Sequence, residues 1–223
     1  MVQRGGPTVS HRYPTSTCLE RGTQKRLIDA AAFSAHLGTS IDTHITINAA
    51  RLQSIDGGGI IGLGHLWDGF QDLLERLRKW TTGRNVPWVC IWVREVAGGP
   101  GEHWHIALHL PACHRLDLAH QLADWTEEPI GDGSLLKPHD VAASSLSNWH
   151  ITTRKPGGRG PEGLAAYLGK AEPNRVKLYG KTRINPDKPM PRYRGGEGTI
   201  EGKRHHISKT IGATAQGKAG WTA

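Results

Sequence analysis

Two histidines that are two residues apart, His103 and His105, are the residues of this chain best suited to hold a metal ion. They belong to segment 102–110, in which polar and large apolar side chains alternate with the period of a half-buried β-strand. Positions i and i+2 of a strand point to one face, so both imidazoles can direct a nitrogen at the same cation. The other face, which includes Trp104, is apolar and suited to a core.

A carboxylate that could complete such a metal site is Glu95, at the end of the preceding apolar run. The Gly- and Pro-rich stretch 96–101 predicts a hairpin that brings this run back beside the next strand. We therefore expect Glu95 to lie beside His103 and His105, and one carboxylate with two imidazoles suits Mg²⁺ or Mn²⁺. Glu102 is the competing carboxylate, but the strand period turns its side chain to the opposite face.

A tyrosine that could act as a nucleophile, Tyr167, lies on a helix predicted over residues 162–172. Lys170 follows three residues later and falls on the same helix face. A phenol has a pKa of about 10 and is a poor nucleophile, but a nearby ammonium group and metal ion favour the phenolate. Gly169 is unfavourable inside a helix, which indicates that a side chain there would obstruct something.

Strands and helices of an α+β domain are predicted around these residues. In chain order, they are a strand at 43–48, a helix at 63–80, strands at 86–93 and 102–110, a helix at 116–125, a strand at 149–153 and the helix at 162–172. Apolar residues recur at intervals of three and four residues in the helices, and they alternate with polar residues in several strands. This order predicts a split βαβ fold (βαββαβ, ferredoxin- or RRM-like): an antiparallel sheet with helices on one face, plus a C-terminal catalytic helix. The sheet face that carries the histidines would then be free to bind something.

The positive charge of the chain is concentrated near its C-terminal end. Its net charge is +8, and residues 172–223 contain eleven Lys or Arg against four acidic residues. We therefore expect three parts: a partly flexible arm over residues 1–40, a nearly neutral domain over 41–172, and a basic tail over 173–223. Such a tail is typical of nucleic-acid binding. Its candidate DNA contacts are Arg175, Lys177, Lys181, Arg183, Lys203 and Arg204.

Composition disfavours several other classes of protein. The three cysteines lie far apart without a CxxC pair, and Cys90 sits in an apolar strand, so we expect neither a disulfide framework nor a thiolate zinc site. No run approaches the roughly twenty apolar residues of a membrane helix. The polar start of the chain does not resemble a signal peptide. The expectation is a cytoplasmic protein without a membrane partner.

The motifs His103-Trp104-His105 and Tyr167-Leu168-Gly169-Lys170, in this order, resemble those of the HUH endonucleases, specifically the rolling-circle replication initiators with a single catalytic tyrosine. The similarity covers residues 41–172. The strand at 43–48 corresponds loosely to the first family motif, and Trp104 is bulkier than the usual aliphatic residue between the histidines.

The resemblance implies that His103, His105 and Glu95 bind a divalent metal ion, that Tyr167 is the nucleophile and that Lys170 is its partner. The implied activity is metal-dependent, site-specific nicking and joining of single-stranded DNA through a 5′-phosphotyrosine, initiating rolling-circle replication of a plasmid, phage or integrated element. Expected partners are single-stranded DNA or a hairpin origin, and a host replication helicase, because the chain has no GxxxxGK[ST] motif.

Three alternatives remain open. A single-tyrosine HUH transposase has the same motif order and is disfavoured mainly by the long basic tail. A non-catalytic DNA-binding regulator on the same fold would bind DNA in EDTA and form no covalent adduct. A metallohydrolase for small substrates is a weaker third alternative, because such an enzyme needs neither the basic tail nor the YxxK pattern.

Overall fold

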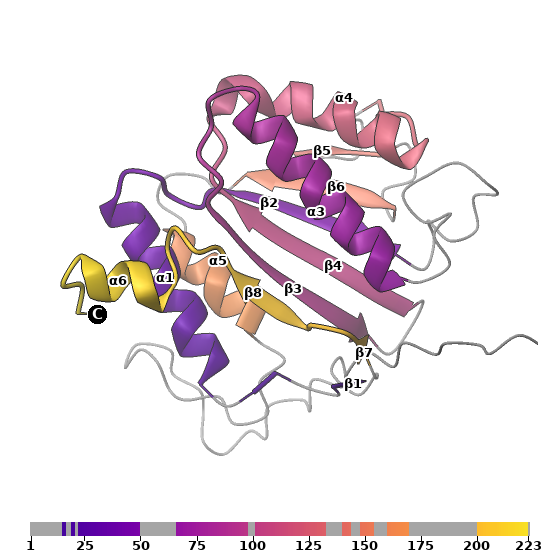
Figure 1. Ribbon diagram of the computed structural model, residues 1–223. Coiled ribbons are helices and arrows are strands. Elements are labelled where there is room, and N and C mark those ends of the chain that lie inside the picture. The colour runs from indigo at the N-terminus through magenta and orange to yellow at the C-terminus, as the bar shows by residue number, and fades with distance from the viewer. Residues whose placement is uncertain are drawn as a thin grey trace, which may run out of the picture.

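The computed structural model describes residues 15–16, 19–20, 22–49, 66–97, 101–132, 140–143, 148–153, 160–169 and 200–222. It is an α+β fold whose main sheet has six antiparallel strands in the order β5-β6-β2-β4-β3-β8 (Figure 1). The strands of this sheet are β2 (Thr43–Asn48), β3 (Cys90–Ala97), β4 (Gly101–Leu108), β5 (Val141–Ala142), β6 (Trp149–Thr153) and β8 (His205–Ile207). The α-helices are α1 (Thr23–His36), α3 (Leu66–Thr82), α4 (Arg115–Thr126), α5 (Gly160–Leu168) and α6 (Ala213–Lys218). A short 3₁₀ turn, η1 (Ala112–His114), precedes α4, and β1 (Thr15–Ser16) pairs with β7 (Ile200–Glu201).

The strands and helices expected after residue 42 are confirmed, with shifts of a few residues at their ends. Strands β3 and β4 pair as the predicted hairpin, but they run further into the expected turn 96–101, with Val96 opposite Glu102 and Ala97 opposite Gly101, and residues 98–100 lie outside the described residues. Helix α3 ends at Thr82, immediately before Gly83, and α5 starts at Gly160, two residues earlier than expected. The predicted helical residues 63–65 and 170–172 lie outside the described residues.

The first core lies between one face of the sheet and helices α3 and α4. Trp104, Ile106 and Leu108 of β4 are buried there, as the alternation in this segment predicts. Cys90 belongs to the same core, and burial raises the pKa of its thiol. This cysteine is therefore an inert apolar filler, as its position in the strand suggested.

A second core lies on the opposite face of the sheet, beneath helices α1 and α5. The alternate residues of the strands, among them Ile91, Val93 and Ala107, pack there against Phe33 and Leu164. The two helices that follow the first and third strands, α3 and α4, lie on one face as expected, but the expectation that the other face is free is wrong, because α1 and α5 cover part of it (Figure 1). The histidine-bearing face is open only in part.

Helix α1 corrects the expectation of an irregular arm over residues 1–40. Thr23–His36 form 14 residues of α-helix, in which Leu27, Ile28 and Phe33 are buried. Its alanines favour a helix, and its apolar residues have a place to pack because α5 lies alongside it. Thus the folded domain begins well before residue 41.

Part of the expected basic tail also belongs to the folded domain. Strand β8 extends the sheet along β3, with Ile91 opposite Ile207. After α6, the Trp221 ring packs against Phe33 of α1 at a centroid distance of 5.5 Å. Residues 200–222 are therefore structural, whereas residues 170–199 lie outside the described residues. None of the helices in the described part of the chain has the length and apolar content of a membrane span.

Candidate active site

The pairing of three neighbouring strands places the predicted metal ligands on one face of the sheet. His103 on β4 lies directly between Glu95 on β3 and Asn48 on β2. His105, two residues further along β4, lies opposite Thr46 of β2. Because residues paired in a ladder share a face, all five side chains belong to the face that α1 and α5 cover only in part.

Glu95 and His105 are in direct contact. The Nε2 atom of His105 lies 3.2 Å from Oε2 of Glu95, and both side chains are buried. This contact is diagonal across the hairpin, since Glu95 pairs with His103. The sequence prediction placed Glu95 beside the two histidines, and the structure brings it there.

The spacing of two donor atoms on this face is compatible with a hard divalent cation. Adjacent ligands of an octahedral ion at about 2.1 Å lie about 3 Å apart, close to the 3.2 Å between His105 Nε2 and Glu95 Oε2. Asn48 is buried, and its Oδ1 has no hydrogen-bond partner among the described residues, so it offers a further oxygen donor. No group of three or more His, Cys, Asp or Glu in the described ranges is already arranged as a metal site. His103 is half-buried, and its role as the third ligand stays a prediction.

Glu102, the competing carboxylate, faces the opposite side of the sheet as predicted. Its Oε1 accepts hydrogen bonds from Arg94 Nε at 2.5 Å and from Trp104 Nε1 at 2.7 Å. The Arg94 guanidinium also lies over the Trp67 ring, 4.9 Å from its centroid. Glu102 therefore neutralises a buried arginine and cannot serve the histidine face.

The predicted nucleophile, Tyr167, lies beside the buried histidines. Its ring stands edge-on to the rings of His105 and His44, with centroid distances of 5.9 and 6.0 Å. Tyr167 is nevertheless 42% exposed, so a substrate can approach it from solvent. Its predicted partner, Lys170, lies outside the described residues.

A close approach of two helices holds Tyr167 in this place. The side chain of Gln24 on α1 donates a hydrogen bond of 2.9 Å from Nε2 to the Ala166 carbonyl oxygen of α5. A Cβ atom at Gly169 would lie only 2.5 Å from Cγ and 2.9 Å from Cα of Gln24. Glycine at this position thus lets α1 and α5 meet, which explains the obstruction expected there.

We expect Gly169→Ala to slow any reaction of Tyr167. The added methyl group must push α5 away from α1, and a displacement of about 1 Å at a nucleophile costs up to about 100-fold in rate. The measurement is the rate of covalent adduct formation with single-stranded DNA, together with the thermal midpoint Tm. Gly217→Ala in α6 is the matched control, because its Cβ would meet nothing within 4 Å. Equal rates for both variants would contradict this positioning role.

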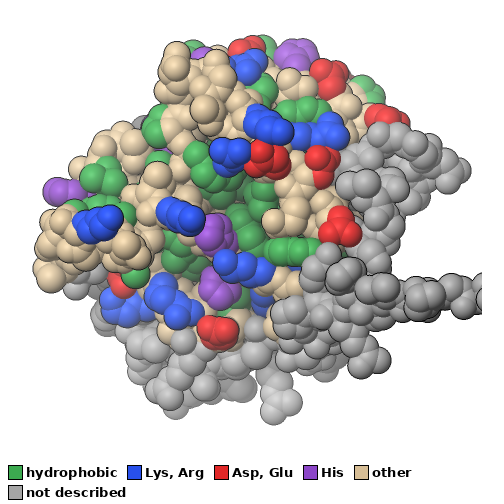
Figure 2. Space-filling view, in the orientation of Figure 1, with side chains coloured by type: hydrophobic (Ala, Val, Ile, Leu, Met, Phe, Trp, Pro, Cys, Tyr) green, Lys and Arg blue, Asp and Glu red, His purple; other side chains and the backbone are tan. Residues whose placement is uncertain are grey.

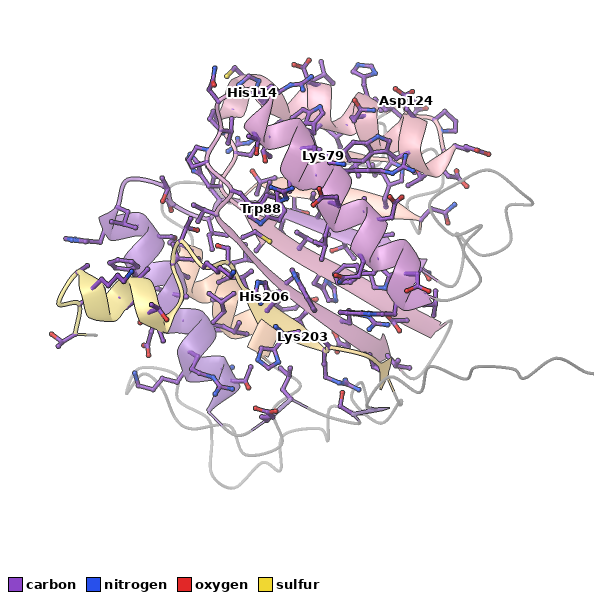
Figure 3. The ribbon with its side chains drawn as sticks, viewed as in Figure 1. Lys79, Trp88, His114, Asp124, Lys203 and His206 are labelled. Carbon is purple, nitrogen blue, oxygen red and sulfur yellow. The ribbon has the colours of Figure 1, made fainter. Side chains whose placement is uncertain are left out.

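Two of the predicted DNA contacts of the tail, Lys203 and Arg204, lie among the described residues, and both contact other parts of the fold. Arg204 is buried, and its guanidinium donates to the Ser16 hydroxyl and carbonyl oxygens. Lys203 is exposed but contacts His206, with Nζ 3.0 Å from Nδ1, and the His206 ring packs on Trp92 of the first core (Figure 3). Arg204 therefore has a structural role, which corrects the prediction that its guanidinium faces DNA. The other four predicted contacts, Arg175, Lys177, Lys181 and Arg183, lie outside the described residues.

Basic side chains are nevertheless present on the face formed by α3 and β8. Figure 2 shows Lys and Arg side chains on both sides of a strip of hydrophobic side chains there, with Asp and Glu side chains among them. On α3, Arg76 pairs with Asp72 and Arg78 pairs with Glu75, so this face is mixed in charge. The β8 histidines add little charge near neutral pH, because burial and then the positive charge of Arg26 lower the pKa of His205 to about 4. Burial and Lys203 likewise lower the pKa of His206.

Sequence reasoning missed three residues of the candidate site, Asn48, His44 and Gln24. His44 was visible only as part of an alternating strand, and its Nε2 atom lies 3.3 Å from Nδ1 of His105. Its alternation with Thr46 placed it on a polar face, but nothing in the sequence showed which strand would lie alongside. Gln24 lay in a segment where no helix was expected.

Comparison of the chain with protein-family models, with curated proteins and with solved structures gives no significant match.

Proposed function

We propose that the chain is a metal-dependent endonuclease and strand transferase for single-stranded DNA, with Tyr167 as its nucleophile. The observation that carries the proposal is the meeting of three elements at one point: Tyr167 of α5 stands against His105 of β4, and His105 contacts Glu95 of β3. A partly exposed phenol beside a buried carboxylate–imidazole pair combines a nucleophile with hard-cation ligands.

The fold proposal is the split βαβ arrangement. The elements β2, α3, β3, β4, α4 and β6 follow the order βαββαβ, and their strands are neighbours in the order β6-β2-β4-β3. Helices α3 and α4 pack on the same face of the sheet. Helix α5 would then be the added catalytic helix, on the opposite face.

In this proposal Glu95, His105 and His103 hold Mg²⁺ or Mn²⁺. The bound ion supplies a positive charge that stabilises the charge developing on the scissile phosphate. The edge-on contacts of the Tyr167 ring with His44 and His105 hold the phenol at the edge of the site, where the phosphate can reach it. Lys170 is proposed to bind the phosphate or lower the phenol pKa.

The reaction conserves the number of phosphorus–oxygen bonds. The Tyr167 oxygen forms a bond to phosphorus and its proton passes to solvent, while the bond from phosphorus to the 3′ oxygen breaks and that oxygen takes up a proton. The products are a 5′-phosphotyrosine and a free 3′-OH. Because the bond energy is retained, a 3′-OH can attack the phosphotyrosine and rejoin the strands.

The proposed use of this activity is initiation of rolling-circle replication, with a hairpin origin and a host helicase as partners. A single-tyrosine transposase has the same chemistry and is the nearest alternative. A non-catalytic DNA-binding regulator is the alternative from another class. The partly exposed Tyr167 against His105 favours the enzyme, since a DNA-binding surface needs neither.

The test is incubation of the full chain with a library of short single-stranded DNAs and Mn²⁺, followed by denaturing electrophoresis. We expect a covalent protein–DNA band that EDTA abolishes. Glu95→Gln keeps the size of the side chain but removes a charged ligand, and should lower the rate of adduct formation by at least about 10-fold at limiting Mn²⁺, because even partners of metal ligands change affinity by about that much. DNA binding in EDTA with no band under any condition would favour the regulator and refute the enzyme.

A further inference from the structure

His44 is the best-placed residue of the site that has no assigned role. It is buried, and its Nε2 atom lies 3.3 Å from Nδ1 of His105 and 3.4 Å from the Thr46 hydroxyl oxygen. Its ring also meets the Tyr167 ring edge-on. One side chain thus contacts both the predicted metal ligand and the predicted nucleophile.

The two nitrogens of His105 have different neighbours. Nε2 faces Glu95 at 3.2 Å, whereas Nδ1 faces His44 at 3.3 Å and the Thr46 hydroxyl oxygen at 3.4 Å. A neutral imidazole carries one proton, so a ring that offers its Nε2 lone pair to a cation must carry the proton on Nδ1. That proton then needs an acceptor inside a buried site.

His44 is the better of the two acceptors. An imidazole nitrogen is more basic than a hydroxyl oxygen, and His44 is also the closer neighbour of His105. To accept this proton, His44 carries its own proton on Nδ1 and directs its Nε2 lone pair at His105 Nδ1. Partners that fix the tautomer and orientation of a ligating histidine typically change metal affinity by about 10- to 100-fold.

We propose that His44 is a positioning residue that holds His105 in the Nδ1–H tautomer, with Nε2 directed at the metal and at Glu95. This inference rests on the proposed metal site. It makes β2 part of the active site: the strand supplies an acceptor for the ligand on β4 and a packing surface for the nucleophile on α5.

The first test is Mn²⁺ affinity, measured on the full-length chain from the electron paramagnetic resonance signal of free Mn²⁺. His44→Phe keeps a ring against Tyr167 but removes the acceptor, and should weaken Mn²⁺ binding about 10- to 100-fold. His44→Gln places an amide group near the Nε2 position and should restore affinity to within about threefold. His150→Phe on β6 is the matched control, because it makes the same change on the same sheet face without contacting His105, and should bind Mn²⁺ normally.

The second test reads the tautomer directly and needs no active enzyme. In ¹⁵N NMR of histidine-labelled wild-type protein with Mg²⁺, we expect His105 in a single Nδ1–H form; the signal is assigned with His105→Asn. In His44→Phe that form should no longer dominate. An Nε2–H form in the wild type, equal Mn²⁺ affinity in wild type and His44→Phe, or an equal loss in Thr46→Val would each overturn the proposal.

These results separate the inference from the proposed function. If His44→Phe loses Mn²⁺ affinity and His44→Gln regains it, the positioning role holds even when no covalent DNA adduct forms; the proposed DNA chemistry then fails alone. If adducts form and His44→Phe binds Mn²⁺ as the wild type does, the positioning role fails alone.

Discussion

Replacing Tyr167 with phenylalanine should abolish the covalent DNA adduct, a loss of at least about 10³-fold in the rate of its formation. The substitution removes only the hydroxyl, so the edge-on contacts of the ring with His44 and His105 are kept. Mn²⁺ affinity and Tm should therefore stay near the wild-type values. The measurement is the yield of SDS-resistant protein–DNA band over time.

The other three tyrosines, Tyr13, Tyr179 and Tyr193, provide the controls. Tyr193→Phe should form the adduct at the wild-type rate. Mass spectrometry of the digested adduct should place the nucleotide on the peptide that contains Tyr167. A nucleotide on any other tyrosine would disprove the assignment, even if Tyr167→Phe were inactive.

Replacing Glu102 with alanine should destabilise the fold by about 3–5 kcal/mol, the usual effect of removing one partner of a buried ion pair. Arg94 is 1% exposed and Glu102 is 6% exposed, so the substitution leaves a buried guanidinium without its counter-charge. The same guanidinium donates to the Lys203 carbonyl oxygen at 3.3 Å, and the Arg94 backbone N–H donates to the Arg204 carbonyl oxygen. Loss of the ion pair should therefore also weaken the contacts between Arg94 of β3 and the residues that precede β8.

The measurement is the free energy of unfolding in urea, with Glu75→Ala as the control. Glu75 accepts two hydrogen bonds of 2.8 Å from Arg78, which lowers the pKa of Glu75 to about 2. Both side chains are exposed, so water and salt screen this pair and its loss should leave stability almost unchanged. An equal effect of the two variants would contradict the structural role of Glu102.

Measurements of both Mn²⁺ binding and stability distinguish the roles of the two carboxylates of the hairpin, Glu95 and Glu102. Glu95→Gln should change Mn²⁺ binding more than stability, whereas Glu102→Ala should lower stability with or without Mn²⁺. The difference follows from position alone, since Glu95 contacts His105 on one face and Glu102 contacts Arg94 on the other. If a folded Glu102→Ala variant lost more Mn²⁺ affinity than Glu95→Gln, the assignment of the two carboxylates to opposite faces of the sheet would be wrong.

The local periods of the sequence determined most of the elements. Alternation over residues 102–110 gave a strand with Trp104 in the core and His105 on the other face, as the structure has them. The apolar residues at intervals of three and four residues in α3 and α4 likewise predicted helices. Such patterns depend on neighbours a few residues away, so the sequence alone carries them.

The face that each hairpin residue occupies was also predictable, because a short Gly- and Pro-rich turn brings one strand back beside the other. Glu95 and Glu102 are close in the chain, and the period of two separates them. This local geometry is why a carboxylate beside the two histidines could be expected before the fold was known.

Long-range packing decided what the local patterns could not. His44 meets His105 only because β2 pairs with β4, and Tyr167 meets both only because α5 packs on α1. Helix α1 was missed because its short apolar stretch becomes stable once α5 covers it, and the three-residue β8 was missed because it is too short to show a period. Contacts between distant segments depend on which surfaces remain to be buried after the local elements have formed, and no short-range pattern records that.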